Sequence, residues 1–443
     1  MPRTVILLLA MIFSASAQGE TLWKGTSAHA VVDGAGDVLD EDGAVIDLSA
    51  ESTGEATFVG AIASLDARSF KVRNVRLAGR LRVDQGTGAA ALWVRADGPK
   101  GRLAFASSGG EPVRAGEGAR EREVLLYVPE ASTRIMFGVT LGSAGTLHAE
   151  RLTLTSAAVE ATDVSAYDMM AHALPLIRAK ALNTGNVNWA AEEAALLTDD
   201  QKKLPAQEAY TGLRRVLDAL ADRHSLLETP KQASVYGAQA IRSRPMESRP
   251  IADIGYIQVP GLRGTGAHDG AAFTAELCNR IATLASASTK GWIVDLRQDN
   301  GGNMWPMLNG LHSLLGDSDA GGFRDRQGKT RKWRARASPE CRGDLSDSRV
   351  AMLVGPKTAS SGEAVAVAFR ARPGTRFFGQ TTAGLATANT TFPLPDGGTL
   401  WLTTAAMADR EGNEYPRGIV PEVVVSGDQD AIEMAAGWLR SAP

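Results

Sequence analysis

Cysteine is nearly absent from this chain, which has only Cys278 and Cys341 among its 443 residues. Neither cysteine has histidine or cysteine neighbours at metal-ligand spacing, so we expect no zinc site. An oxidising compartment would allow the two thiols to form a disulfide, and the sequence equally allows two separate thiols.

An excess of charge of either sign is also lacking. The 47 basic and 50 acidic side chains leave a formal charge of −3. Proteins that neutralise many phosphates carry a basic surface, so the balance argues against nucleic acid as a partner. Hydrophobic residues make up 44% and charged residues 22%, values at which every sizeable segment can bury a core, which excludes wholesale disorder.

Long apolar runs are missing beyond the amino terminus. There, Arg3 precedes an apolar run from Thr4 to Phe13, and small residues follow as far as Ala17. This order is typical of a secretory signal, and the run is shorter than the ~20 residues that a membrane anchor needs. We therefore expect residues 1–17 to be removed and the mature protein to be periplasmic or secreted, with no membrane span. Whether it forms an oligomer stays open.

A chain of 443 residues exceeds the ~250–300 that one core usually supports, so we expect several units. Residues 18–158 carry short alternating or β-branched runs between glycine-rich turns, the pattern of an antiparallel β-sandwich. Its polar segment 108–121 is expected to be a surface loop. Residues 159–229 show helical spacing of apolar positions over 164–182 and 207–220.

The second half of the chain alternates strands and helices. Residues 230–250 are polar and proline-containing without a period, and we expect a linker there. Residues 251–443 predict an α/β core with parallel strand pairs and a hairpin around Asp396. Its expected strands are 254–259, 291–296, 350–354 and 376–379, and its expected helices are 272–287, 304–315 and 361–372.

The most informative stretch runs from Val350 to Ala364, where an apolar strand passes through small residues directly into a helix. A serine at such a turn lies at the carboxyl edge of the sheet, next to the unpaired amides of the helix amino terminus. Those amides can stabilise an oxyanion. The alternative is that Ser360 or Ser361 merely caps the helix, with Glu363 completing a capping box.

Two further stretches favour a catalytic role for the serine over a helix-capping role. Asp295-Leu296-Arg297-Gln298-Asp299-Asn300-Gly301-Gly302 is a buried strand followed by paired glycines, which let backbone amides approach a ligand. It lacks the Gly-Lys-Ser/Thr ending of a phosphate loop. Asp222-Arg223-His224-Ser225 closes a predicted helix, and histidine is the side chain best suited to deprotonate a serine near neutral pH.

Together these stretches resemble the tail-specific, or C-terminal processing, serine peptidases and their tricorn-core and retinoid-binding-protein-like relatives. The resemblance covers about residues 162–425, including Ile254-Gly255-Tyr256-Ile257 and Arg417-Gly418-Ile419-Val420-Pro421-Glu422. It implies a ClpP/crotonase-like core, Ser360 as nucleophile, three residues ahead of Glu363, and the amides of Gly302 and Ser361 as the oxyanion hole.

The chain departs from the processing proteases at two points. Leu385 stands where their Gly-x-x-Thr-x-Gly-Lys pattern has the catalytic lysine, so the base must come from elsewhere and the tricorn-like branch points to His224. The interval from Ser225 to Ile254 is too short for their PDZ insert.

A catalytic histidine usually needs an acceptor on its second ring nitrogen. In the tricorn branch a serine before the histidine and a distant glutamate contribute, but Arg223 takes the serine's place here. Glu414 lies where the glutamate could fall, and Asp222 is the rival orienter.

The sequence thus predicts an exported serine peptidase that acts by acyl-enzyme chemistry on peptides or unfolded protein tails. No metal, nucleotide or flavin motif accompanies it, so we expect no cofactor. An esterase with the same chemistry and a non-catalytic ligand- or peptide-binding protein are the alternatives. The β-sandwich would bind carbohydrate, position a peptide or serve as a spacer.

Overall fold

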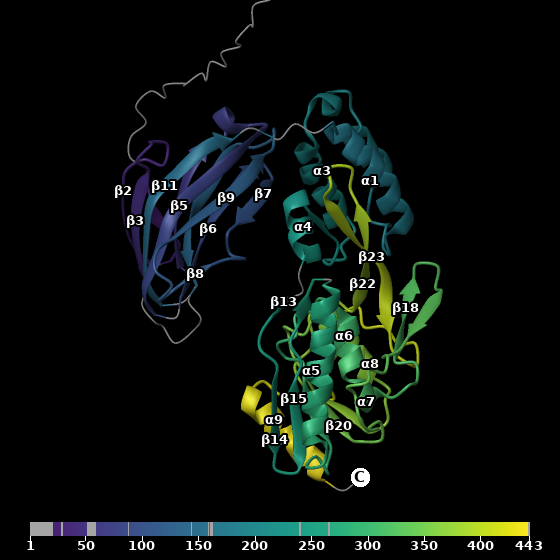
Figure 1. Cartoon of the computed structure of the whole chain (residues 1–443). Helices are drawn as coiled ribbons and strands as arrows, with labels where there is room; N and C mark the ends of the chain where they lie inside the picture. Colours follow the sequence, from purple (N-terminus) through teal and green to yellow (C-terminus); the bar gives the residue numbers. More distant parts are fainter. Residues whose placement is uncertain are drawn as a thin grey trace, which may run out of the picture. The chain divides into compact units, whose positions relative to one another are not determined.

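The computed structural model describes residues 21–441 except 28–29, 51–58, 87, 143, 158, 160–162, 239–240 and 265. The predicted signal 1–17 lies outside the described residues. The chain divides into two compact units, one of residues 1–166 with 203–211 and the other of 167–202 with 212–443 (Figure 1). Each unit is described by itself.

The first unit is an antiparallel β-sandwich, as predicted. All its strand pairs are antiparallel. Alternate residues of its strands are buried between the sheets, among them Ile46, Leu77, Leu92 and Phe137. One sheet contains β1 (Lys24–Gly25), β4 (Val59–Asp66), β10 (Arg134–Leu141), β6 (Ala89–Gly98) and β7 (Gly101–Ser107) in this order, with β8 (Val113–Arg114) beside β6. The other contains β2 (Ala30–Ala35), β3 (Ala44–Ala50), β11 (Gly145–Ala157), β5 (Arg73–Gly86) and β9 (Arg120–Val128).

A helical segment follows the sandwich in the chain. It contains α1 (Ala166–Lys180), α2 (Trp189–Leu196) and α3 (Ala206–Ala219), so both predicted helices form and α2 is additional. The sequence did not reveal α2 because it is only 8 residues long and buries just Leu196. A turn after α3 leads to the candidate base His224.

The main sheet of the second unit has the order β14-β15-β17-β20-β21-β24. Neighbours from β15 to β24 run parallel, and β14 is an antiparallel edge strand. The sheet is composed of β14 (Glu247–Ile251), β15 (Ile254–Gln258), β17 (Trp292–Asp295), β20 (Val350–Val354), β21 (Thr375–Gly379) and β24 (Val423–Val424). One core joins it to α5 (Ala267–Ala285), α6 (Met304–Gly310), α7 (His312–Leu315) and α8 (Ser361–Phe369), and another to α9 (Asp428–Arg440). This is the predicted α/β core.

A second sheet connects the histidine segment to this core. Its order is β12-β23-β18-β19, and β22 pairs with the other edge of β23. Its strands are β12 (Leu226–Glu228), β18 (Gly321–Asp325), β19 (Thr330–Trp333), β22 (Thr387–Pro393) and β23 (Thr399–Ala408). Because β12 begins two residues after His224 and pairs with β23, the turn that carries the histidine is held beside the β22–β23 hairpin.

The linker predicted over residues 230–250 is wrong. The segment contains α4 (Pro230–Ala238), β13 (Ile241–Arg242) and the edge strand β14. Pro230 is tolerated at the first position of α4, where no intrahelical N–H bond is needed, and Pro250 is tolerated on an edge strand. The predicted loop 108–121 likewise contains β8 and the start of β9.

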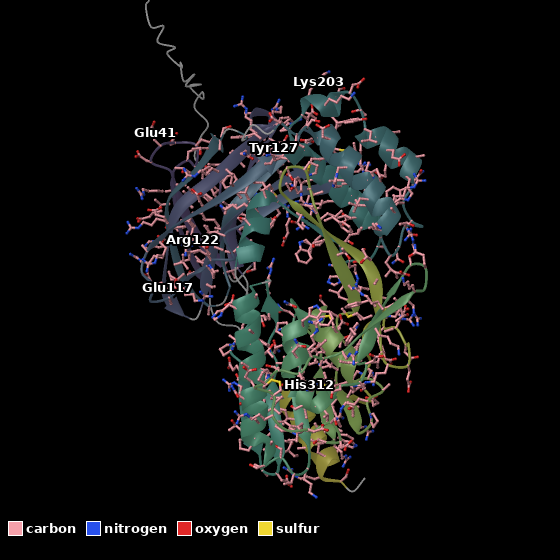
Figure 2. All side chains as sticks on the ribbon, turned by 45° about the vertical axis from the view of Figure 1, so that its right-hand side comes forward. Glu41, Glu117, Arg122, Tyr127, Lys203 and His312 are labelled. Atoms are coloured by element: carbon pink, nitrogen blue, oxygen red, sulfur yellow. A yellow bond between two sulfur atoms is a disulfide. The ribbon has the colours of Figure 1, made fainter. Side chains whose placement is uncertain are left out.

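The two cysteines form a disulfide that connects α5 to the segment preceding β20 (yellow in Figure 2). This decides between the two alternatives that the sequence left open. Within the described ranges, no helix is long and apolar enough to cross a membrane.

Candidate active site

Ser360 lies at the junction of β20 and α8 in a conformation that side chains rarely adopt. Its φ of 52° and ψ of −114° make it one of the few non-glycine residues with positive φ. Such strain costs about 1–3 kcal/mol and is typical of a nucleophile raised on a sharp strand-to-helix turn. Thr358 secures the turn, since its Oγ1 accepts from the Gly355 amide at 3.0 Å and donates to the Leu296 carbonyl at 2.8 Å.

Gly301 and Gly302 lie directly against this turn. A Cβ added to Gly301 would be 2.9 Å from the Cβ of Ser360, and one added to Gly302 would be 2.0 Å from the carbonyl oxygen of Leu262. Their φ angles of 100° and 122° also favour glycine. The paired glycines therefore let a second backbone segment approach the serine.

The two amides of the predicted oxyanion hole come from backbone segments that contact each other. Gly302 forms a bridge with Leu262 that uses the amide of Asn303, at 2.7 Å, rather than its own. Ser361 is the first residue of α8, so its amide has no intrahelical acceptor. Its hydroxyl donates to the Gly302 carbonyl at 2.5 Å, which joins the two sides of the predicted oxyanion hole.

Asp299 supports the same region and was not singled out by the sequence. Its carbonyl accepts from the Ala359 amide at 3.0 Å and its Oδ1 from the Gly301 amide at 2.9 Å. The side chain is fully buried, and burial raises the pKa of the carboxyl to about 8. It is therefore a neutral acid near neutral pH, beneath the nucleophile turn.

His224 is half-buried in a turn whose neighbours Ala221 and Arg223 both have positive φ. Asp222 holds this turn, since its carboxylate accepts from the His224 and Ser225 amides at 2.9 and 2.8 Å. Burial lowers the pKa of the His224 ring, and the charge of Asp222 opposes that shift. A lowered pKa keeps the imidazole neutral near neutral pH, the form in which it can accept a proton.

The ring of His224 contacts neither of the orienters that the sequence predicts. Its Nδ1 lies 2.7 Å from Oγ1 of Thr387, the first residue of β22. The carboxylate of Glu414 pairs instead with Arg324 at 3.2 Å, and Asp222 binds only the backbone and the Ser225 hydroxyl of its own turn. In this structure Glu414, which follows β23, therefore pairs with Arg324 of β18 and makes no hydrogen bond to the His224 ring.

Glu363 has a larger role than a helix cap. Its buried carboxylate accepts from the Ser360 amide at 3.1 Å, from Thr382 Oγ1 at 2.6 Å, and from the amides of Gly384 and Leu385 at 2.9 and 2.7 Å. The capping contact expected of Glu363 is thus present together with the strained serine. The same carboxylate anchors the loop in which leucine replaces the family's lysine.

This loop separates the two candidate catalytic residues. On one side the Ala383 amide donates to the Thr358 carbonyl at 3.0 Å, and on the other Arg223 donates to the Ala383 carbonyl at 3.4 Å. In the part of the chain that the structure describes, Ser360 makes no direct hydrogen bond to the His224 ring. Such contacts are often loose without substrate, so the arrangement is compatible with a dyad.

Residues 253–425 match the model of peptidase family S41. This region is a peptidase family S41 domain. The predicted resemblance to the processing peptidases is thereby confirmed at the level of the family, together with the α/β fold. The match begins after His224, so the proposed base lies on the segment that precedes the matched region.

Two proteins and one solved structure illustrate what this chain is similar to. A nisin-resistance protein of Lactococcus lactis subsp. lactis is 27% identical over 276 residues, which are 59% of this chain and 82% of that protein. A carboxy-terminal-processing protease of Bartonella bacilliformis is 27% identical over 188 residues, 42% of each chain. The structure of a lipoprotein from Streptococcus agalactiae covers 64% of this chain and 99% of that one, with 26% identity and a TM-score of 0.55.

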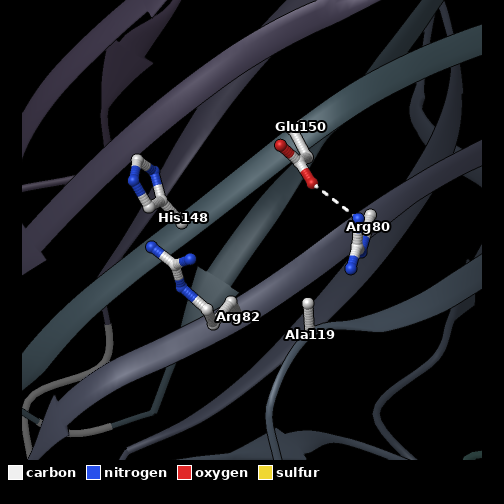
Figure 3. A pocket seen from close by; sticks show the side chains of 5 residues that line it. All are labelled: Arg80, Arg82, Ala119, His148 and Glu150. Atoms are coloured by element: carbon white, nitrogen blue, oxygen red, sulfur yellow. Dashed lines mark ion pairs between the residues drawn. The ribbon is translucent and has the colours of Figure 1, made fainter.

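A pocket on the sandwich is distinct from the S41 domain. It lies on the outer face of β5 and β11 and is lined by Arg80, Arg82, Ala119, His148 and Glu150 (Figure 3). Its charges are compensated in pairs, Arg80 with Glu150 and Arg82 with Asp84, and Nδ1 of His148 contacts the carboxylate of Asp47. The pocket has no aromatic lining residue on which a sugar ring could stack, so it does not favour the carbohydrate alternative.

Proposed function

We propose that this protein is an exported serine peptidase, in which Ser360 is the nucleophile and His224 the general base. The family supports a peptidase, and the backbone of Ser360 is the observation that carries the assignment. A side chain that only capped α8 would not need φ of 52° and ψ of −114° beside Gly301 and the buried Glu363.

The proposed reaction is acyl transfer to water. Nε2 of His224 takes the proton of the Ser360 hydroxyl as its oxygen attacks the scissile carbonyl, and the amides of Gly302 and Ser361 stabilise the oxyanion. The imidazolium then gives the proton to the leaving amine. A water molecule, deprotonated by the same ring, hydrolyses the acyl-enzyme and frees the serine.

The substrates we propose are peptides or unfolded protein tails outside the cytoplasm, in the periplasm or the medium. The names of two relatives suggest two concrete substrates to test, nisin and a peptide with a free carboxyl terminus. A small ester should be tested beside them, because turnover of the ester alone would favour an esterase.

The deciding experiment uses a fluorophosphonate, which reacts only with activated serines. Residues 18–443 would be incubated with the probe and the adduct located by peptide mass spectrometry. We expect labelling at Ser360, abolished by Ser360→Ala and reduced about 100-fold or more in rate by His224→Ala. His268→Ala, which replaces an exposed histidine of the same unit, is the matched control and should label normally.

A non-catalytic binding protein is the second candidate. The lysine replaced by Leu385 and the absence of a direct serine–histidine hydrogen bond among the described residues favour it. Absence of labelling in correctly folded protein would overturn the peptidase proposal and support this one.

A further inference from the structure

His224 needs a group that holds its ring, and the two carboxylates expected for this task are engaged elsewhere. Glu414 pairs with Arg324, and the carboxylate of Asp222 accepts three hydrogen bonds from its own turn. Among the residues that the structure describes, the hydrogen-bond partner of the ring is the hydroxyl of Thr387, 2.7 Å from Nδ1. On this contact, and on the function proposed above, we propose that Thr387 is the positioning residue of the catalytic histidine.

Hydrogen bonds connect the backbone of Thr387 to the segment that carries Ser360. Its amide donates to the Leu385 carbonyl at 2.8 Å, and the Leu385 amide donates to Oε2 of Glu363 at 2.7 Å. The same Oε2 accepts from the Ser360 amide. A continuous series of hydrogen bonds therefore connects the backbone of the nucleophile to the residue that holds the base.

The other side of the histidine is held by the same hairpin. Asn389 of β22 donates its side-chain amide to the carbonyl oxygen of His224 at 2.9 Å and accepts from Thr403 of β23 at 2.9 Å. Both the ring and the backbone of His224 thus depend on β22. The loop that has lost the family's lysine is continuous with the strand that positions the replacement base.

The proton arrangement follows from the role of the base. If Nε2 is to accept the proton of Ser360, Nδ1 must carry the ring hydrogen and donate it to Oγ1 of Thr387. After proton transfer both ring nitrogens carry hydrogens, and Nδ1 still donates to Thr387. The opposite arrangement, in which Thr387 donates to Nδ1, would leave a hydrogen on Nε2 and block catalysis.

A hydroxyl differs from a carboxylate in one measurable way. A carboxylate on Nδ1 stabilises the imidazolium and raises the pKa of the ring, whereas a neutral hydroxyl orients the ring without adding charge. The charged groups near the ring are Asp222 and Arg223 of its own turn, and Glu363 of α8 on the other side of the loop 382–387. The strands β22 and β23 contribute only uncharged groups beside the histidine, namely Thr387, Asn389 and Thr403. A change at Thr387 should therefore alter the acid limb of the activity profile directly.

Three variants of Thr387 test the proposal. Fluorophosphonate inactivation rates of the full chain would be measured between pH 5 and 9. We expect Thr387→Val to slow inactivation about 10-fold or more and Thr387→Ser to stay within about threefold of the wild type. Thr387→Asp should move the acid limb to higher pH by about one unit, because its carboxylate stabilises the protonated ring.

The control is Thr391→Val, which makes the same change on an exposed position of β22 and should leave the rate and profile unaltered. Circular dichroism would confirm that each variant is folded. The inference would be overturned if the wild type is labelled and neither Thr387→Val nor Thr387→Asp changes the inactivation rate or the acid limb of its pH profile. That outcome would leave the peptidase proposal intact. An unlabelled wild type would instead refute the peptidase proposal itself.

Discussion

At the scale of single residues, the site depends on groups that are unfavourable in isolation. Ser360 has a strained backbone, and Asp299 has a carboxyl with no exposure to solvent. Oδ1 of Asp299 accepts one backbone hydrogen bond, and its Oδ2 has no partner among the described residues. Such costs are tolerated where neighbouring structure holds the residue in place, as the Gly301–Gly302 segment and the start of α8 do here.

Burial of Asp299 predicts a pH dependence of stability. The folded pKa of about 8 lies above the ordinary value, so the unfolded chain loses this proton first as pH rises. The contribution of the acid to stability is therefore complete below about pH 4 and is lost as pH rises toward 8. Asp299→Asn keeps an oxygen for the Gly301 amide and removes the titration.

We expect Asp299→Asn to raise the free energy of unfolding at pH 8 by a few kcal/mol and to change it little at pH 4. Chemical denaturation at both values would measure this difference. Asp40→Asn, a change at an exposed position, is the control. Equal pH dependence in wild type and Asp299→Asn would contradict the prediction.

At the scale of elements, the start of α8 and the loop 382–387 behave as one structure. Each oxygen of the Glu363 carboxylate accepts two hydrogen bonds. Oε1 accepts from Thr382 and Gly384, and Oε2 accepts from Ser360 and Leu385. Burial raises the pKa of this carboxyl, and the four donors oppose the shift. The start of α8 at Ser360 and the loop that leads into β22 are therefore positioned by one side chain.

Glu363→Gln tests this connection. A glutamine would present amide hydrogens to two of the four donors, so we expect a loss of about 2–4 kcal/mol in the free energy of unfolding and severe loss of Ser360 labelling. Glu433→Gln on the exposed side of α9 should alter neither quantity. Normal stability and labelling of Glu363→Gln would show that the loop is held by other contacts.

At the scale of the whole molecule, the hydrophobic cores are separate. The members of the sandwich core lie between Val38 and Leu154, and those of the two cores around the main sheet lie between Met246 and Leu439. The disulfide belongs to the second group, because it connects α5 to the segment before β20. We expect the two units to unfold in separate transitions.

Removal of the disulfide should affect one transition alone. Because the cysteines are separated by 63 positions in the sequence, loss of loop-closure entropy predicts a destabilisation of about 4 kcal/mol at most. Scanning calorimetry of Cys278→Ala/Cys341→Ala should show a lower unfolding temperature for the S41 domain and an unchanged one for the sandwich. A parallel shift of both transitions would contradict the separation of the cores.

Several features could be predicted because they depend on local patterns. The apolar run Val350–Val354 followed by small residues predicts a buried strand and a turn, and β20 has those bounds. The paired glycines 301–302 predict a close backbone approach, which the structure shows. Where the local pattern was weak, in the polar edge strand β14 and in α4, the prediction of a linker was wrong.

The sequence by itself determined the classes of the two folds, the strand-to-helix turn at Ser360 and the glycines beside it, because alternation of burial, strand length and backbone freedom are encoded by neighbouring residues. Only the tertiary structure decided that the cysteines pair, that Glu363 connects Ser360 to the loop 382–387, and that Thr387 rather than Glu414 contacts the histidine. These contacts join residues 63 and 163 positions apart in the chain, or depend on which face of a strand points inward. Distances of that kind follow from how sheets and helices pack, which no local pattern specifies.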